Sequence, residues 1–124
     1  MTKQSPSKRQ LQTRQMFKDA LYRLLHRDPY SSITVSSLCQ EADLARRTFY
    51  RHYETLDDLL EDIIRDYVME FLSWRNNRYL KEPSFRKLFE LFFAFWSERS
   101  QLLLLFERQN LYSYLAHVFD EVLI

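Results

Sequence analysis

The chain has 124 residues, three prolines, no glycine and a formal net charge of +1. This length supports one small domain, or one domain and part of another, with a buried core. Without glycine, the sequence excludes the glycine-rich loops that cradle phosphates in many nucleotide-binding enzymes. The abundance of Leu, Phe, Glu, Arg and Tyr favours an all-α fold with short connections.

Charge is distributed unevenly along the chain. Residues 1–53 hold ten Lys and Arg and four acidic residues, a net charge of +6, whereas the remainder has eight basic and 13 acidic residues, a net charge of −5. This division predicts an electrostatic footprint for nucleic acid confined to the N-terminal part. The longest apolar runs, Leu91–Trp96 and Leu102–Phe106, are much shorter than the ~20 residues that span a bilayer. With no signal peptide recognised, we predict a soluble, cytoplasmic protein without a membrane partner.

The N-terminal segment is predicted to be a flexible arm followed by a helix. Residues 1–10 are polar and basic and include Pro6, so their cations either reach DNA phosphates or only aid solubility. A helix is expected over Leu11–Arg27, ending at Asp28-Pro29 because a residue before proline avoids helical angles. Its apolar stripe consists of Phe17, Ala20, Leu21, Leu24 and Leu25.

The segment Thr34–Tyr53 predicts two short helices joined by a tight turn. Thr34 is a suitable N-cap for the first helix. The apolar stripe of that helix has the spacing i, i+3, i+4, i+7 and consists of Val35, Leu38, Cys39 and Ala42. This arrangement is typical of a helix-turn-helix.

The second of these helices has a basic outward face. At ~100° per residue, one side of the helix collects Arg46, Arg47, Tyr50 and Arg51. Phe49 and Tyr53 fall on another side, where they can pack inward. The major groove of B-DNA admits one α-helix, and Arg can donate two hydrogen bonds to a guanine. A basic face alone is more often a solvated surface, but its place after a capped, amphipathic helix favours DNA binding.

An ordered set of residues from about Thr13 to Leu60 carries a family resemblance. It consists of Ala20-Leu21, Tyr30, Ile33-Thr34-Val35, Leu38, Ala42, Leu44, Thr48-Phe49-Tyr50-Arg51-His52-Tyr53 and Leu59-Leu60. This pattern resembles the TetR-type bacterial transcriptional regulators. The resemblance implies a three-helix DNA-binding domain with a helix-turn-helix over residues 11–54, followed by a helical effector-binding and dimerisation region over residues 55–124.

The resemblance also implies roles for individual residues. The recognition helix would be Arg46–Tyr53, with base contacts from Arg46, Arg47 and Tyr50. Phosphate contacts would come from Thr34, Thr48, Tyr50 and His52, and Ser36 matches a position that can also reach DNA. The implied function is a regulator, expected to be a repressor, that binds a palindromic operator as a homodimer and responds to a small-molecule effector.

Three positions depart from the family pattern. Asp43 replaces the turn glycine, although Asp tolerates the left-handed conformation at modest cost. Ala45 cannot cap the recognition helix, which forgoes ~1 kcal/mol. Leu56 stands where a lysine usually contacts phosphate, and Asp57 and Asp58 follow it. These last residues favour an alternative function, a TetR-like co-regulator that binds a protein partner instead of DNA.

The C-terminal region is predicted to be entirely helical. Thr55 and Asp58 have the form of a capping box, and a long helix is expected from there to about Asn77. Its apolar stripe consists of Leu56, Leu60, Ile63, Tyr67, Phe71 and Trp74. The segment Lys81–Ser84 is a boundary, after which helices are expected from Pro83 or Ser84, from about Ser100, and over Leu111–Ile124. We expect this region to be incomplete, since the chain is either a fragment or an unusually short relative.

The first helix after this boundary is crowded with aromatic side chains. The density of Phe and Trp predicts that it is largely buried. Four of these residues are candidates for a ligand pocket: Phe89, Phe92, Phe93 and Trp96. A core or a subunit interface, which every helical bundle needs, is the favoured interpretation of the same residues. A small-molecule binding bundle is therefore a third hypothesis.

Catalysis has little support in the sequence. His26, His52 and His117 are far apart in the predicted helices, and no acidic or thiol residue accompanies them at metal or nucleophile spacing. Cys39 is a lone thiol on an inward face, more often a small core residue than a reactive one. We therefore expect no enzyme activity, no cofactor and no metal.

Overall fold

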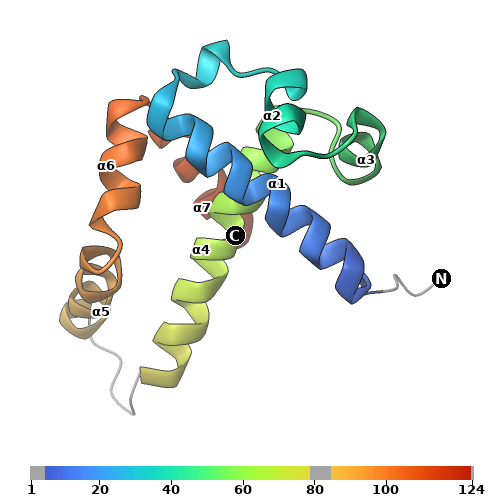
Figure 1. The fold of residues 1–124 in the computed structure, drawn as a ribbon. Coiled ribbons are helices and arrows are strands. Elements are labelled where there is room, and N and C mark those ends of the chain that lie inside the picture. The colour runs from blue at the N-terminus through green and yellow to red at the C-terminus, as the bar shows by residue number, and fades with distance from the viewer. Residues whose placement is uncertain (1–4, 79–84, 124) are drawn as a thin grey trace. The chain divides into compact units, whose positions relative to one another are not determined.

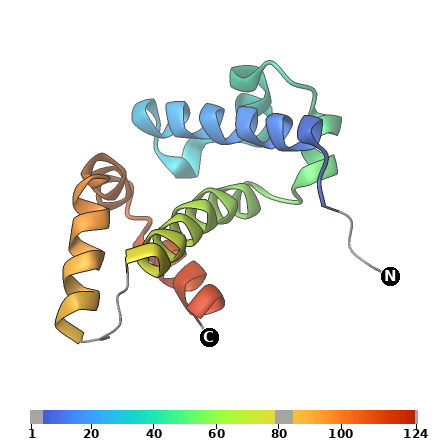
Figure 2. The ribbon, with the colours of Figure 1, turned by 90° about the horizontal axis from the view of Figure 1, so that it is seen from below.

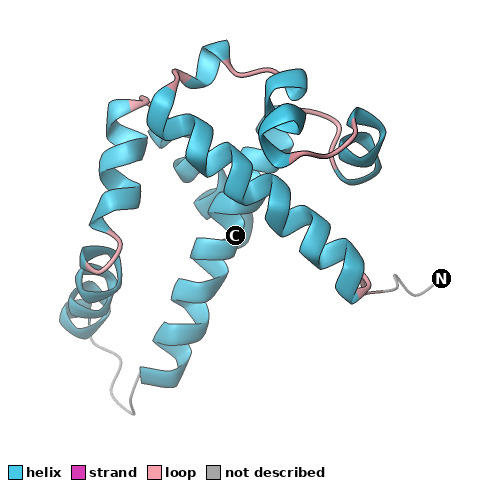
Figure 3. Ribbon diagram, in the orientation of Figure 1, coloured by secondary structure: helices cyan, strands magenta, loops and turns pink. Residues whose placement is uncertain are grey.

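The computed structural model describes residues 5–78 and 85–123, and Figure 3 shows only helices and loops among them. The predicted all-α fold is therefore confirmed. The helices (Figure 1) are α1 (Lys8–Arg27), α2 (Val35–Ala42), α3 (Arg46–His52), α4 (Leu56–Arg78), α5 (Phe85–Ser97), α6 (Ser100–Arg108) and α7 (Tyr112–Leu123), with a short 3-10 helix, η1 (Tyr30–Ser32). In the described part of the chain, no helix combines the length and apolar character needed to cross a membrane.

Helix α1 begins three residues earlier than predicted. Ser7 caps it, since the Ser7 hydroxyl accepts a hydrogen bond from the Gln10 N–H (3.2 Å) and the Gln10 side-chain oxygen accepts one from the Ser7 N–H (2.8 Å). The prediction placed Ser7 in a flexible arm, whereas the structure shows that it opens a reciprocal capping box. Lys8 and Arg9 consequently belong to a helix and not to a flexible arm. Residues 1–4 of the predicted arm lie outside the described residues.

The chain divides into two compact units, Met1–Leu60 and Glu61–Ile124. In the first unit α1 packs against α2, and α2 packs against α3 (Figures 1 and 2). The predicted α1 stripe is buried in full: Phe17, Ala20, Leu21, Leu24 and Leu25. Phe17 and Phe49 are both 0 % exposed and meet edge to face, with ring centroids 5.5 Å apart. Burying each such ring contributes about 1.5–3 kcal/mol.

Two ion pairs tie the end of α1 to α2. Glu41 on α2 lies within salt-bridge distance of Arg23 (3.8 Å) and also pairs with Arg27. The Arg side chains are more than half exposed, so these pairs add little beyond the apolar core. The orientation of α2 therefore depends mainly on Leu38 and Cys39, which are buried.

Helix α4 begins with the predicted capping box. The Thr55 hydroxyl accepts from the Asp58 N–H (3.2 Å), while a carboxylate oxygen of Asp58 accepts from the N–H groups of Thr55 (3.1 Å) and Glu54 (3.2 Å). The helix continues to Arg78, one residue beyond the predicted end. Its buried residues are Leu59, Leu60, Ile63, Ile64, Val68 and Phe71. Three members of the predicted stripe are only half-buried: Leu56, Tyr67 and Trp74.

The second unit has its own core, made by α4, α5, α6 and α7. Phe95 on α5 is fully buried and lies 5.2 Å from the Phe71 ring of α4. The guanidinium group of Arg99 lies over the Phe95 ring, 3.7 Å from its centroid, and pairs with Glu70. A cation on a partly buried aromatic face is stabilising. From α6 and beyond, the core includes Leu102, Leu105, Phe106, Leu111 and Val118.

Helix α5 is less buried than its aromatic content predicted. Phe95 and Trp96 are buried, but Phe92 and Phe93 are 40 % and 54 % exposed. The expectation of a largely buried helix is therefore wrong for this side of α5. Apolar side chains at positions 92, 93, 95 and 96 span too wide an arc for one helix to bury all of them against a single neighbouring surface.

Candidate nucleic-acid interface

The turn between α2 and α3 has the conformation that the sequence predicted. Thr34 caps α2, since its hydroxyl accepts from the Ser37 N–H (3.0 Å), and the Ser37 hydroxyl accepts from the Thr34 N–H (2.9 Å). At the other end, Asp43 adopts the left-handed conformation (φ 56°, ψ 46°) in place of a glycine. The N–H groups of Asp43 and Leu44 then bond to the carbonyls of Gln40 (3.3 Å) and Cys39 (3.0 Å). This pair of bonds is a Schellman motif, which ends α2 and fixes the direction of the chain towards α3.

Helix α3 is held in place by its apolar side. Phe49 is fully buried and Tyr53, the C-cap residue, is 7 % exposed, with ring centroids 5.6 Å apart. Ala45 stands at the N-cap with extended angles and no side-chain cap, as the sequence indicated. A helix this short is marginal by itself, so packing of Phe49 against α1 determines its position.

The outward face of α3 carries three of the predicted base-contacting residues. Arg46, Arg47 and Tyr50 are exposed, with Tyr50 at 50 %. The Tyr50 ring meets Phe49 edge to face at 5.3 Å, which restrains its direction. The structure thus presents two guanidinium groups and one phenol on a helix whose other side is anchored in the core. This is the surface that a recognition helix needs for a major groove.

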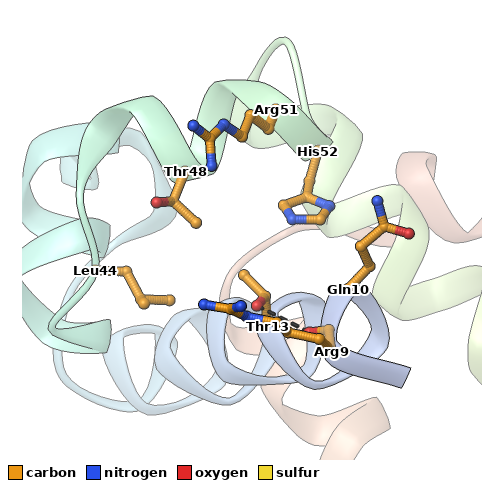
Figure 4. Close-up of a pocket in the computed structure, with 7 residues that line it drawn as sticks. All are labelled: Arg9, Gln10, Thr13, Leu44, Thr48, Arg51 and His52. Atoms are coloured by element: carbon orange, nitrogen blue, oxygen red, sulfur yellow. Dashed lines mark hydrogen bonds between the residues drawn. The ribbon is translucent and has the colours of Figure 1, made fainter. Parts of the chain in front are cut away.

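The remaining predicted residues of α3 line a cavity between α3 and α1. Thr48, Arg51 and His52 face Arg9, Gln10 and Thr13 of α1 across a space of about 460 Å³, with Leu44 at the turn (Figure 4). Figure 4 shows side chains from both helices directed into this space. Arg51 therefore lies with Thr48 and His52, apart from the cluster of Arg46, Arg47 and Tyr50.

His52 is constrained by an arginine of α1. The Arg14 Nε–H donates to His52 Nδ1 (3.3 Å), so the neutral imidazole carries its proton on Nε2. Burial lowers the pKa of His52, and the nearby charges of Arg14 and Arg51 lower it further. The cavity consequently holds a neutral histidine with Nε2–H as a donor. The permanent cations among its lining residues are Arg9 and Arg51.

The α1 residues of this cavity were not predicted as site residues. Arg9 and Thr13 are four residues apart and so share a face of α1, and the Thr13 hydroxyl donates to the Arg9 carbonyl (3.0 Å). The available signal was the Ser7-to-Gln10 spacing of a capping box, which extends α1 far enough to carry Arg9. Because residues 1–10 were predicted to form an arm, the face of α1 that carries Arg9 was not predicted.

The two predicted residues of α2 lie at its N-terminus. Thr34 and Ser36 are both exposed, and the Thr34 hydroxyl is engaged in the cap. The positive end of the α2 dipole and its first N–H groups lie at the same place, an arrangement that suits a phosphate.

The predicted aromatic pocket is only partly described. Phe92 and Trp96 lie 6.2 Å apart by ring centroids, and Phe93 is exposed. Trp96 is buried, and its Nε1 has no hydrogen-bond partner among the described residues. The side chain of Phe89 lies outside the described residues.

Two further side-chain observations concern reactive chemistry. Burial raises the pKa of the Cys39 thiol, against a smaller lowering by Arg46, which disfavours a reactive thiolate. In the part of the chain that the structure describes, no group of three or more His, Cys, Asp or Glu side chains is arranged to hold a metal ion.

A capped helix, a fixed turn and a second helix with an exposed basic face define a helix-turn-helix DNA-binding protein. The family model "Bacterial regulatory proteins, tetR family" matches residues 18–63. Comparison with the curated proteins and with the solved structures found no match. Residues 18–63 are thus similar to the DNA-binding domain of the TetR family, and this similarity supports a DNA-binding transcription regulator of the TetR type.

Proposed function

We propose that the protein is a repressor that binds a palindromic operator as a homodimer and releases it in response to an effector. The observation that supports this most is the exposed face of Arg46, Arg47 and Tyr50 on a helix anchored by Phe49. Two such helices in a dimer would enter successive major grooves ~34–36 Å apart. An effector bound in the C-terminal unit would act by changing that separation.

In this proposal some of the site residues contact the bases of the DNA and the others contact its phosphate backbone. Arg46, Arg47 and Tyr50 contact base edges, because their side chains are exposed and lie outside the cavity. Phosphate contacts come from two places along the groove. The residues at the start of α2 are Thr34 and Ser36, and those beside the cavity are Thr48, Arg51 and His52. Phosphate contacts fix the register of the helix, and base contacts supply the sequence preference.

The acidic residues that favoured a protein-binding co-regulator have structural partners. Asp58 caps α4, and Asp57 accepts a hydrogen bond from the Tyr30 hydroxyl (2.5 Å). Both acids therefore have a role in holding α4 and η1 that requires no protein partner. Leu56 still lacks the phosphate-contacting amine of the family pattern, and it keeps the co-regulator as the second candidate function.

The test is binding of the purified protein to genomic fragments from around its own gene, at two salt concentrations and with excess competitor DNA. We expect retention of one fragment and a steep loss of affinity with salt, since each neutralised phosphate releases counterions. If a folded protein retains no fragment above the competitor, the regulator acts without DNA contact and the co-regulator function takes precedence.

Leu56→Lys tests whether the lysine of the family pattern, which Leu56 replaces at the start of α4, would contact a phosphate. Position 56 is half-buried at the first residue of the helix. If a phosphate lies there, the new amine should tighten binding to any duplex and make the dependence of log affinity on log salt steeper by about one phosphate contact. An unchanged salt slope would remove position 56 from the interface. Leu56→Gln, which changes polarity without adding charge, is the control.

A further inference from the structure

The cavity between α1 and α3 has the composition of an anion site. Two guanidinium groups, Arg9 and Arg51, line it from opposite helices, and no carboxylate is among its lining residues. None of the ion pairs among the described residues includes either of these arginines. Two like charges facing one space repel each other unless an anion lies between them.

The neutral groups of the cavity are arranged as donors. The Gln10 side-chain oxygen is engaged by the Ser7 N–H, so its NH₂ group is the part left to face the cavity. His52 Nδ1 accepts from Arg14, which leaves Nε2–H as a donor. Thr48 adds a hydroxyl. Several donors beside two cations match the lone pairs of a tetrahedral oxyanion, for which Arg is well suited.

We propose that this cavity is a binding site for a phosphate-type oxyanion, formed jointly by Arg9 and Gln10 of α1 and by Arg51 and His52 of α3. The α1 residues lie outside the segment that the family model matches, residues 18–63. The anion is either a phosphate of the DNA backbone beside the recognition helix or a free oxyanion in solution. Only the DNA source rests on the proposed function, because the free anion requires no DNA.

Direct binding is tested with sulfate, whose charge does not change near neutral pH. The purified protein, without DNA, is titrated with sodium sulfate and, at equal ionic strength, with sodium chloride, while the His52 imidazole signals are followed by NMR. We expect a saturable response to sulfate that exceeds the response to chloride. A bound anion should also raise the pKa of His52, opposing the effects of burial, Arg14 and Arg51.

The matched variants are Arg9→Gln and Lys8→Gln. Both remove one positive charge from the first turn of α1, but Arg9 lines the cavity and Lys8 does not. Arg9→Gln should weaken sulfate binding at least about tenfold, the loss expected for a charge-assisted hydrogen bond. Lys8→Gln should keep it within about twofold, as long-range charge alone is screened. Equal responses to sulfate and chloride, or equal losses in both variants, would overturn the proposal.

A second arm identifies the source of the anion. If the site takes a backbone phosphate, sulfate should displace operator DNA more than chloride does at equal ionic strength, and Arg9→Gln should remove that excess. If the site takes a free anion away from DNA, both variants should bind operator equally while only Arg9→Gln loses sulfate. Should the protein bind no DNA at all, the proposed function fails, while the sulfate titration still decides the anion site.

Discussion

The two units of the chain bury their aromatic residues differently. In the N-terminal unit, Phe17 and Phe49 are fully buried in contact with each other, and the exposed surface of α3 is left to Arg46, Arg47 and Tyr50. In the C-terminal unit, several large apolar side chains are 40–60 % exposed: Met69, Phe92, Phe93, Leu104 and Tyr112. The first unit also exposes Leu11 and Met16, but in the second unit the exposed apolar side chains are more numerous and include two Phe rings, as on a surface that another molecule covers. The first unit thus completes its own core, whereas the second has the surface expected of the proposed dimer.

The largest expected effect comes from the same substitution made in both units. Phe49→Ala should lower the free energy of unfolding by about 3–5 kcal/mol, because it leaves a cavity against Phe17. Phe93→Ala should lower it by less than about 1 kcal/mol in the monomer, since its ring is 54 % exposed. Urea denaturation followed by circular dichroism measures both.

Protein concentration sharpens this first test. If Phe93 lies in a dimer interface, the cost of Phe93→Ala should grow with protein concentration, because association stabilises only the folded state. The cost of Phe49→Ala should not change with concentration. Equal costs for the two substitutions at low concentration would show that the contrast in burial does not reflect the fold in solution.

The second-largest expected effect is a loss of affinity for DNA. Arg47→Ala should cost about 1–3 kcal/mol of affinity at the operator and nearly nothing in stability, because the side chain is exposed. Arg108→Ala, an exposed arginine at the end of α6, is the control outside the proposed interface. Fluorescence anisotropy with an operator duplex and a scrambled duplex measures the loss. An equal loss on both duplexes would assign Arg47 to phosphate and not to a base.

Much of the N-terminal unit could be predicted because its local signals are unambiguous. Thr34 as a cap, Asp43 in the left-handed conformation and Phe49 on the inward side each follow from one residue and its neighbours. The C-terminal helices could be predicted only from the periodicity of their apolar residues. This periodicity gives the limits of each helix but does not show which of its sides packs against a neighbouring helix. For α5 that difference matters, because Phe92 and Phe93 have the same sequence signal as buried Phe95.

The cavity residues could not be predicted, for a different reason. Arg9 and His52 are 43 positions apart, and only the packing of α1 on the helix-turn-helix brings them to one space. Periodicity assigns a face to each helix but does not identify which faces meet. The early start of α1 at Ser7 then decides whether Arg9 is in a helix at all.

A third, smaller effect uses a feature that both units share. Asp43 and Asn110 both have φ 56° in a chain without glycine, and each ends a helix with Schellman-type bonds. Glycine carries no steric penalty at such positions. Asp43→Gly and Asn110→Gly should each raise the free energy of unfolding by up to about 1 kcal/mol, with the smaller gain at Asn110, since Asn is the commoner substitute for glycine there. Thermal denaturation measures both, and a loss of stability in either variant would indicate that the side chain has a further role.

The smallest effect is a pH dependence confined to the N-terminal unit. Burial, then Arg14 and Arg51, lower the pKa of His52 in the folded state below its ordinary value of about 6.5. The unfolded chain then binds more protons in the window just below pH 6.5, so this contribution to stability is complete above that pH and is lost as pH falls through it. Arg14→Gln should raise the pKa of His52 in an NMR titration and reduce the loss of stability between about pH 7 and pH 5.5. Lys18→Gln on the same helix controls for the removal of one charge. A His52 pKa that stays the same in Arg14→Gln would mean that burial and Arg51 keep the imidazole neutral without Arg14, and that α1 influences α3 only through packing.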